Sequence, residues 1–312
     1  MLNIKLQLPD NYLEGETRNG YYISPEMKKV WAVLLDLLVE FMRVCDKHHL
    51  KYYMCGGSIL GAVRHGGIIP WDDDIDVMMM RDEYEKLIKV GPAEFQYPYF
   101  FQTEDTDPGS AKGHIQIRNS ETACLSSGAI RNKLPQNQGI FLDVFPIDKV
   151  PERYRTNFPY ITSLVNTRKK MQRYRDFSVL YRFRLRRNII KMLGKLVFFL
   201  FISIVGRRNY YRKLHNRLND ESKKYNNDPK VHGLMLTPYP VENGIWNEKD
   251  FSDTVFMDFE MIKVPLPSGY EHILDCIYGD WHKFEIGTAI HSSVVLDADY
   301  SYLDYFNGTI KK

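Results

Sequence analysis

The sequence predicts an α+β fold in which a mixed sheet with flanking helices carries a basic, largely helical insertion. Three observations predict it. Strand-like and helix-like patterns mix up to residue 150, strand signals vanish over residues 151–225, and mixed patterns return afterwards. We therefore expect a core in residues 1–150, a basic helical segment in 151–225, and a C-terminal part, 226–312, that completes the core domain.

The elements of the first half follow from caps and periodicity. Ser24, Pro25 and Glu26 form an N-cap, a proline at the first helical position and an early acid, and apolar residues then recur at helical spacing, so we expect a helix that ends near His48. Further strands are expected at 52–55, 74–80, 99–103, 114–118, 140–144 and 254–264. Further helices are expected at 58–64, 81–90 and 270–278.

Charge is distributed unevenly along the 312 residues. Residues 151–225 hold 20 Lys or Arg against four Asp or Glu, and the remainder holds 22 against 35, although the net charge is only +3. Such asymmetry is expected when one segment meets an anionic surface and another binds cations. The four cysteines are scattered, which favours a reducing compartment, and the N-terminus does not have the pattern of a signal peptide.

The longest apolar run covers residues 196–205, inside the basic segment. It is short for a membrane span, which needs about 20 residues. The run reaches residues 189–205 if Lys191 and Lys195 are tolerated, and two interpretations of it remain: a buried core helix or a helix that lies in the membrane interface. Clusters of Arg and Lys on both sides of the run favour contact with anionic lipid.

Four carboxylates gather in five positions at Asp72, Asp73, Asp74 and Asp76. Their repulsion is hard to explain unless cations neutralise it. In a strand Asp74 and Asp76 would project to the same side, because alternate residues share a face. Such oxygen ligands suit Mg²⁺ or Mn²⁺, and two ions are the arrangement that clamps a phosphoryl transfer.

A glycine turn precedes these acids. Gly56, Gly57 and Ser58 open a short helix, whose free N–H groups and serine hydroxyl are able to hold phosphate oxygens. Turn and acids are therefore expected to face each other. A solvated acidic loop is the alternative, whereas an EF-hand is disfavoured because Val77 stands where its glycine is required.

These motifs carry a resemblance to a known family. GGSILGAVRHGGIIPWDDDIDV at 56–77 resembles the signature of the LicD family, and QIRNSET at 116–122, GIFLDVFPID at 139–148 and VPLPSGYEHILDCIYGDW at 264–281 resemble further family blocks. The resemblance implies a nucleotidyltransferase-like core. It also implies transfer of phosphocholine, or a related phospho-alcohol, from a CDP-linked donor, with release of CMP.

The resemblance and the strand argument together indicate Asp74 and Asp76 as metal ligands. Asp143, in the apolar run 140–144, is the expected third carboxylate, as a metal ligand or as a general base, unless it pairs with a Lys or Arg. Donor phosphates are expected to meet Gly56, Gly57 and Ser58 and also, further along the chain, Arg64, His65 and Arg118.

The expected activity is transfer to a hydroxyl of a cell-surface glycan, including a lipid-linked one, at the inner face of the cytoplasmic membrane. Two alternatives remain open. The same acids permit nucleotidyl transfer from a nucleoside triphosphate. A non-catalytic basic protein that binds membrane or nucleic acid is the other, and we expect anionic membrane rather than nucleic acid, because the acidic remainder of the chain would repel a polyanion.

Overall fold

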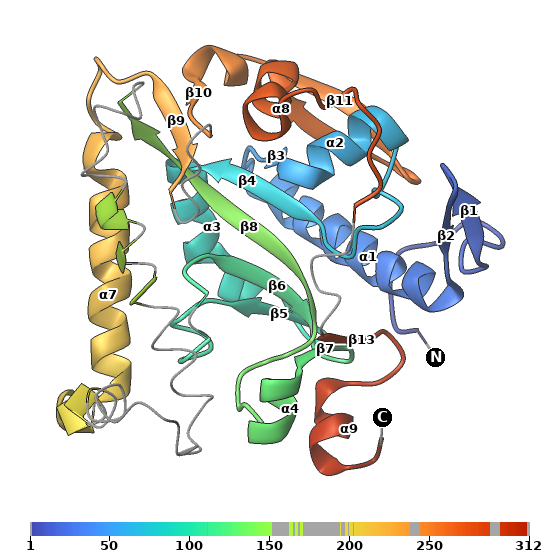
Figure 1. The fold of residues 1–312 in the computed structure, drawn as a ribbon, viewed down its shortest axis with the longest axis horizontal. Helices are drawn as coiled ribbons and strands as arrows, with labels where there is room; N and C mark the ends of the chain where they lie inside the picture. Colours follow the sequence, from blue (N-terminus) through green and yellow to red (C-terminus); the bar gives the residue numbers. More distant parts are fainter. Residues whose placement is uncertain are drawn as a thin grey trace.

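The computed structural model confirms the α+β fold with a mixed sheet (Figure 1). It describes residues 2–110, 112–151, 162–164, 166–167, 169–170, 194, 197–198, 200–201, 203–237, 244–287 and 294–310. The helices are α1 (Pro25–Lys47), α2 (Gly56–His65), α3 (Arg81–Glu94), α4 (Ser127–Asn132), α7 (Arg207–Ser222), α8 (Tyr270–Tyr278) and α9 (Tyr302–Asn307). The strands are β1 (Glu16–Arg18), β2 (Tyr21–Ile23), β3 (Tyr53–Met54), β4 (Asp76–Met80), β5 (Tyr99–Gln102), β6 (Ile115–Asn119), β7 (Ala123–Ser126), β8 (Ile140–Val150), β9 (Gly233–Leu236), β10 (Trp246–Asn247), β11 (Thr254–Phe259), β12 (Ile262–Pro267) and β13 (Val294–Asp297).

The long strand β8 organises the central seven-stranded sheet. The main strand order is β10-β9-β8-β4-β3, and β6 also pairs with β8 and carries β5. β4 runs parallel to β8, whereas β6 and β9 run antiparallel to it. Because β6 pairs with residues 140–144 and β9 with residues 147–150, β8 joins the N-terminal strands to the C-terminal part of the chain.

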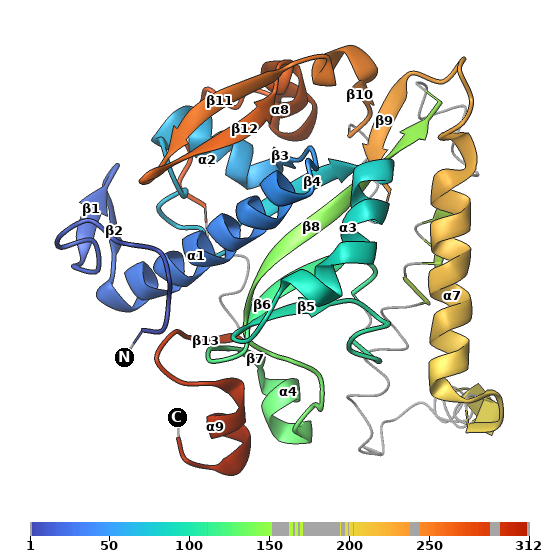
Figure 2. The ribbon, with the colours of Figure 1, turned by 180° about the vertical axis from the view of Figure 1, so that it is seen from behind.

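Two helices cover one face of this sheet. α1 and α3 lie behind the strands in Figure 1 and in front of them in Figure 2. The apolar stripe of α1 is fully buried, as Trp31, Leu34 and Phe41 show, and it contributes to the largest core cluster. That cluster also contains Phe259, from β11, and Ile273, from α8, so the C-terminal part packs into the same core.

Several boundaries differ from the predictions. β4 begins at Asp76, so Asp74 precedes the strand, and β8 extends to Val150. The predicted strand 254–264 is a hairpin, β11 and β12, which turns at Glu260 with φ +55°. The β7–β13 pair was not predicted, because it joins segments about 170 residues apart and neither has a pattern of its own.

The basic segment is described only in part. α7 lies beside the sheet and packs through a small cluster of its own (Leu164, Tyr211, Leu214 and Leu218). Within the described ranges, no helix has the length and apolar character needed to cross a membrane. Residues 152–161 and 171–193 of the predicted basic segment lie outside the described residues.

A buried ion pair attaches α3 to β8. Arg81 donates from Nε and Nη2 to the two carboxylate oxygens of Asp148, at 2.8 and 2.5 Å. Asn226, just after α7, and Thr237, just after β9, also donate to Asp148. Since Asp148 is only 1% exposed, these donors keep the carboxylate satisfied away from water.

Arg81→Met is therefore expected to destabilise the fold by about 3 kcal/mol, because it leaves a buried carboxylate without its main partner. Lys86→Met is the matched control, since it removes the exposed i,i+3 pair with Glu83 and should cost less than about 1 kcal/mol. Urea unfolding of both variants measures the difference. Equal losses would contradict the assigned role of the buried pair.

Candidate active site

The Gly56–Gly57 turn opens α2 beside the first residue of β4. Gly56 has φ +52°, a left-handed conformation that glycine adopts without strain. The Cys55 N–H donates to the Asp76 carbonyl at 2.9 Å, and the Asp76 N–H donates to Ser58 Oγ at 2.9 Å. The turn therefore lies directly beside Asp76, and the Ser58 hydroxyl positions the start of the strand.

The acidic segment before β4 lies against the same turn. Asp72, Asp73 and Asp74 each place a carboxylate oxygen within 4.8 Å of the others. Asp72 fits there because Gly57 has no side chain: a Cβ at that position would lie 3.1 Å from Asp72 Oδ2. Trp31 of α1 donates from Nε1 to the Asp72 carbonyl at 2.9 Å, so α1 also holds this segment in place.

Sheet pairing brings in another carboxylate. Asp143 and Asp76 are register partners on the parallel strands β8 and β4, and the Asp143 N–H donates to the Ile75 carbonyl at 3.3 Å. Asp143 Oδ1 accepts from Gln116 Nε2 at 2.6 Å and lies 2.9 Å from His114 Nε2. Asp143 thus joins the acids across almost 70 residues of sequence.

The electrostatics of the acids are unequal. Burial raises the pKa of Asp74 to about 10, and the nearby Asp76 and Asp72 add repulsion. Burial and the adjacent Asp143 raise the pKa of Asp76 well above its usual range. Burial also opposes ionisation of Asp143, but His114 lowers its pKa below the ordinary value. One favoured anion therefore stands beside two carboxyl groups that need a cation in order to ionise.

Arg118 reaches the acids through a neighbour. It is 2% exposed, and its guanidinium donates to Gln102 Oε1 at 2.6 Å, to the Gly139 carbonyl at 2.5 Å and to Gln116 Oε1 at 2.5 Å. Gln116 in turn donates to Asp143. In this structure Arg118, predicted to meet the donor phosphates, orients the amide that holds Asp143.

Arg64 and His65 end α2 and face the segment after α8. Arg64 donates to the Trp281 carbonyl at 3.2 Å and to His65 Nε2 at 3.0 Å. Burial lowers the pKa of His65 to about 4, so its ring is uncharged near neutral pH. Trp71 packs between the rings of His65 and Phe284, with ring centres 5.9 and 5.5 Å away, and is 8% exposed, as expected for a residue that fills the core.

Two residues near the acids were missed from sequence. Tyr278, at the end of α8, has its hydroxyl 3.8 Å from where a Cβ of Gly56 would lie. Lys112 contributes to the lowered pKa of Asp143. Lys112 had a usable signal, because it stands two positions before His114 and continues the alternation of His114, Gln116 and Arg118. Tyr278 lies in the family-like block 264–281, but only the packing of α8 on α2 brings it to the site.

The donor set suits a hard divalent cation. Asp74, Asp76 and Asp143 offer carboxylate oxygens, the ligands that Mg²⁺ and Mn²⁺ prefer, and their repulsion is what a bound cation relieves. The three carboxylates with oxygens within 4.8 Å of one another are those of Asp72, Asp73 and Asp74, and Asp76 and Asp143 would complete the site from the paired strands β4 and β8. The residues therefore fit the predicted metal.

A family model described as LicD/FKTN/FKRP, nucleotidyltransferase domain, matches residues 49–183. Residues 49–183 are thus similar to this nucleotidyltransferase domain. The matched region contains the glycine turn, the acids before β4, and β8 with Asp143. All residues predicted for the site therefore lie within it.

Two relatives extend the comparison. The chain is 29% identical over 265 residues to the lipopolysaccharide cholinephosphotransferase LicD of Haemophilus influenzae. This alignment covers 82% of this chain and 91% of the relative. It is 61% identical over 51 residues to the ribitol 5-phosphate transferase FKRP of Mus musculus and Homo sapiens, a match to 16% of this chain and 10% of theirs. The chain is an enzyme, a phosphotransferase similar to these two relatives.

The raised pKa of Asp74 predicts an unusual pH dependence for the metal-free enzyme. The folded-state pKa lies above the unfolded value of about 3.9, so the folded state binds more protons and loses stability as pH rises toward the folded pKa. Chelator-treated protein should therefore be less stable to urea at about pH 8 than at about pH 6.

Asp74→Asn should flatten this slope, whereas the matched control Asp258→Asn, at an exposed pair on β11, should keep it. Urea midpoints measured at several pH values in chelator compare the three proteins. The same slope in the wild type and in Asp74→Asn would contradict the assigned electrostatics.

Proposed function

We propose that this enzyme transfers phosphocholine, or a related phospho-alcohol, from a CDP-linked donor to a hydroxyl of a cell-surface glycan and releases CMP. The observation that carries the proposal is the meeting of Asp74, Asp76 and Asp143 beside the glycine turn at the start of α2. Helix N-termini bind phosphate, and clustered carboxylates hold the cations that neutralise a diphosphate. The activities of the two relatives, a cholinephosphotransferase and a ribitol 5-phosphate transferase, support this substrate class.

In this reaction the acceptor oxygen bonds to the phosphorus that carries the alcohol, the bond from that phosphorus to the CMP oxygen breaks, and the hydroxyl proton leaves. Asp143 is the carboxyl group whose pKa is lowered. We assign it to the reacting centre, where it takes up the proton or ligates a metal ion. His114 and Gln116 hold its Oδ1, which leaves Oδ2 for this role.

The other residues bind the donor. We assign the N–H groups of Gly56 and Gly57 to the donor diphosphate. Arg64 and His65, at the other end of α2, are also assigned to the donor phosphates. Lys112 is assigned to a phosphate oxygen near Asp143. Two Mg²⁺ or Mn²⁺ ions, when bound by the acids, neutralise phosphate charge and polarise the breaking bond. This division places cationic and N–H groups on both sides of the acids.

We also propose that the enzyme works as a peripheral protein at the inner face of the cytoplasmic membrane, where a lipid-linked glycan would be presented. The uneven charge along the chain supports this location, because residues 151–225 are strongly basic. The acceptor would then be a hydroxyl near the bilayer surface.

Incubation with CDP-choline, Mg²⁺ and glycan acceptors is expected to release CMP. Asp74→Asn and Asp76→Asn should each lower kcat by at least about a hundredfold, because each removes a charged group from the reacting centre. The matched control Asp258→Asn should retain activity. Chromatography of the released nucleotide measures all four proteins.

A second incubation, with a nucleoside triphosphate as the donor, distinguishes the proposed reaction from nucleotidyl transfer. With CTP in place of the CDP-linked donor, the proposed enzyme releases no pyrophosphate. Pyrophosphate from CTP, with no CMP from any CDP-alcohol, would replace phospho-alcohol transfer by nucleotidyl transfer. Unchanged CMP release in both Asp74→Asn and Asp76→Asn would contradict the assignment of these two residues as metal ligands.

A further inference from the structure

Exposed apolar side chains line one face of the helical segment before α7. Val197, Leu200, Phe201 and Ile204 have the spacing i, i+3, i+4 and i+7, which places them on a single helix face. They are 65%, 52%, 48% and 86% exposed. A core helix would bury this stripe, and a contiguous exposed apolar face marks an interaction surface. We call these four residues the apolar stripe.

One flank of the same segment is packed against α7. Phe198 contacts the small cluster around α7, and the ring centres of Phe198 and of the stripe residue Phe201 each lie 5.9 Å from that of Tyr210. Gly206, with φ +84°, turns the chain between the segment and α7. The segment lies at the end of α7 that is remote from β9 and β10 (Figure 1). The segment is therefore attached to α7 through Phe198 and Phe201, and every residue of the stripe is still at least 48% exposed.

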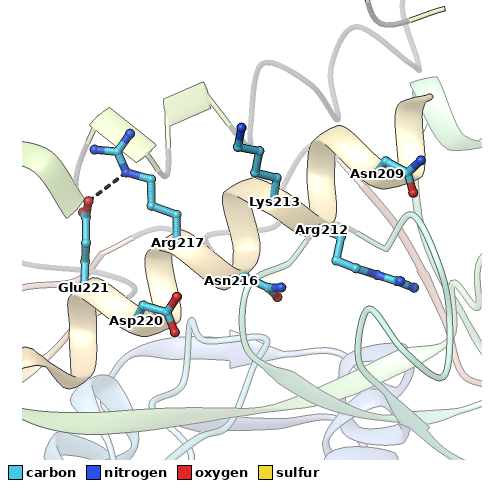
Figure 3. A pocket seen from close by; sticks show the side chains of 7 residues that line it. All are labelled: Asn209, Arg212, Lys213, Asn216, Arg217, Asp220 and Glu221. Carbon is cyan, nitrogen blue, oxygen red and sulfur yellow. Dashed lines mark hydrogen bonds and ion pairs between the residues drawn. The ribbon is translucent and has the colours of Figure 1, made fainter. Parts of the chain in front are cut away.

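Exposed cations continue from the stripe onto α7. Arg212, Lys213 and Arg217 are exposed, and Figure 3 shows Lys213 and Arg217 on the same side of the helix. They line a polar pocket along α7, together with Asn209, Asn216, Asp220 and Glu221. The acids are at its far end, where Glu221 binds Arg217 at 2.7 Å. The end of α7 next to the stripe is thus cationic.

We infer that the apolar stripe and the basic start of α7 form a docking surface for an anionic phospholipid bilayer. Apolar side chains beside exposed cations match the interface of such a bilayer, in which acyl chains lie next to anionic headgroups. A protein partner or a second copy of this chain would satisfy the stripe, but it would have to supply acids opposite Arg212 and Lys213. The inference rests on the proposed function in one respect, since a lipid-linked acceptor would lie at this surface.

The docking surface is mechanically connected to the catalytic sheet. Asn226, just after α7, accepts from the Lys149 N–H at 2.7 Å and donates to Asp148 at 2.7 Å. Lys223 binds Glu85 of α3 at 2.5 Å. Asn226 thus attaches the end of α7 to β8, and Lys223 attaches it to α3, which packs on β8. Because β8 also carries Asp143, docking would set the orientation of the active site relative to the bilayer.

Sedimentation with vesicles tests the inference on the full-length chain. Wild-type protein should bind vesicles of phosphatidylglycerol and phosphatidylcholine, and bind pure phosphatidylcholine weakly. Leu200→Ser with Ile204→Ser should lower the partition coefficient at least about tenfold, because two buried apolar side chains are lost from the interface. Phe256→Ser is the matched control, since Phe256 is 65% exposed on β11, and it should bind like the wild type.

Substitutions of exposed cations test the electrostatic contribution to vesicle binding. Arg212→Gln with Lys213→Gln should weaken binding by about fivefold per charge, and added salt should reduce the difference. Lys89→Gln with Lys249→Gln, at exposed lysines of α3 and of the turn before β11, is the control and should leave binding unchanged.

CMP release with a soluble acceptor separates this inference from the proposed function. Stripe variants that lose vesicle binding but keep CMP release support the inference. Equal vesicle binding by the wild type and the stripe variant would overturn it, as would a wild-type dimer that ignores vesicles and becomes monomeric on Leu200→Ser with Ile204→Ser. Vesicle binding without CMP release would overturn only the proposed function.

Discussion

The parallel pairing of β4 with β8 sets Asp76 beside Asp143, and much of the site depends on it. Two carboxylates side by side at partly buried positions repel each other, and burial together with that repulsion raises the pKa of Asp76. The sheet tolerates the pair because Val77 and Val144, the next residues on each strand, are fully buried in the core. Core packing thus holds together acids that would separate in a free peptide.

Polar contacts hold in place the two acids, Asp76 and Asp143, that the pairing of β4 with β8 brings together. The Ser58 hydroxyl and the Asp76 N–H join the start of α2 to β4, and Gln116 joins β6 to Asp143. Arg118 is buried behind Gln116 and orients its amide. Gln116, which reaches Asp143, is therefore itself held by a second polar group, which helps a site to keep its geometry before substrate binds.

β8 connects this site to the rest of the chain. One half of the strand carries Asp143, and the other half carries Asp148, whose buried contacts reach α3 and the residues after α7 and β9. The basic segment is inserted between β8 and β9, which pair with each other. An insertion at that point leaves the sheet intact because both of its ends return to one antiparallel ladder.

Local patterns were enough for elements whose signals are local. The cap at Ser24 and the glycine turn predicted α1 and the start of α2, and the acids and the apolar run around Asp143 indicated the candidate site residues before any contact was known. Short strands such as β7 and β13, and the approach of Tyr278 to Gly56, depend on partners far along the chain. The sequence by itself determined which residue types carry the chemistry and which faces are apolar. Only the tertiary structure decided which of them meet, because strand pairing and helix packing join segments that share no local pattern.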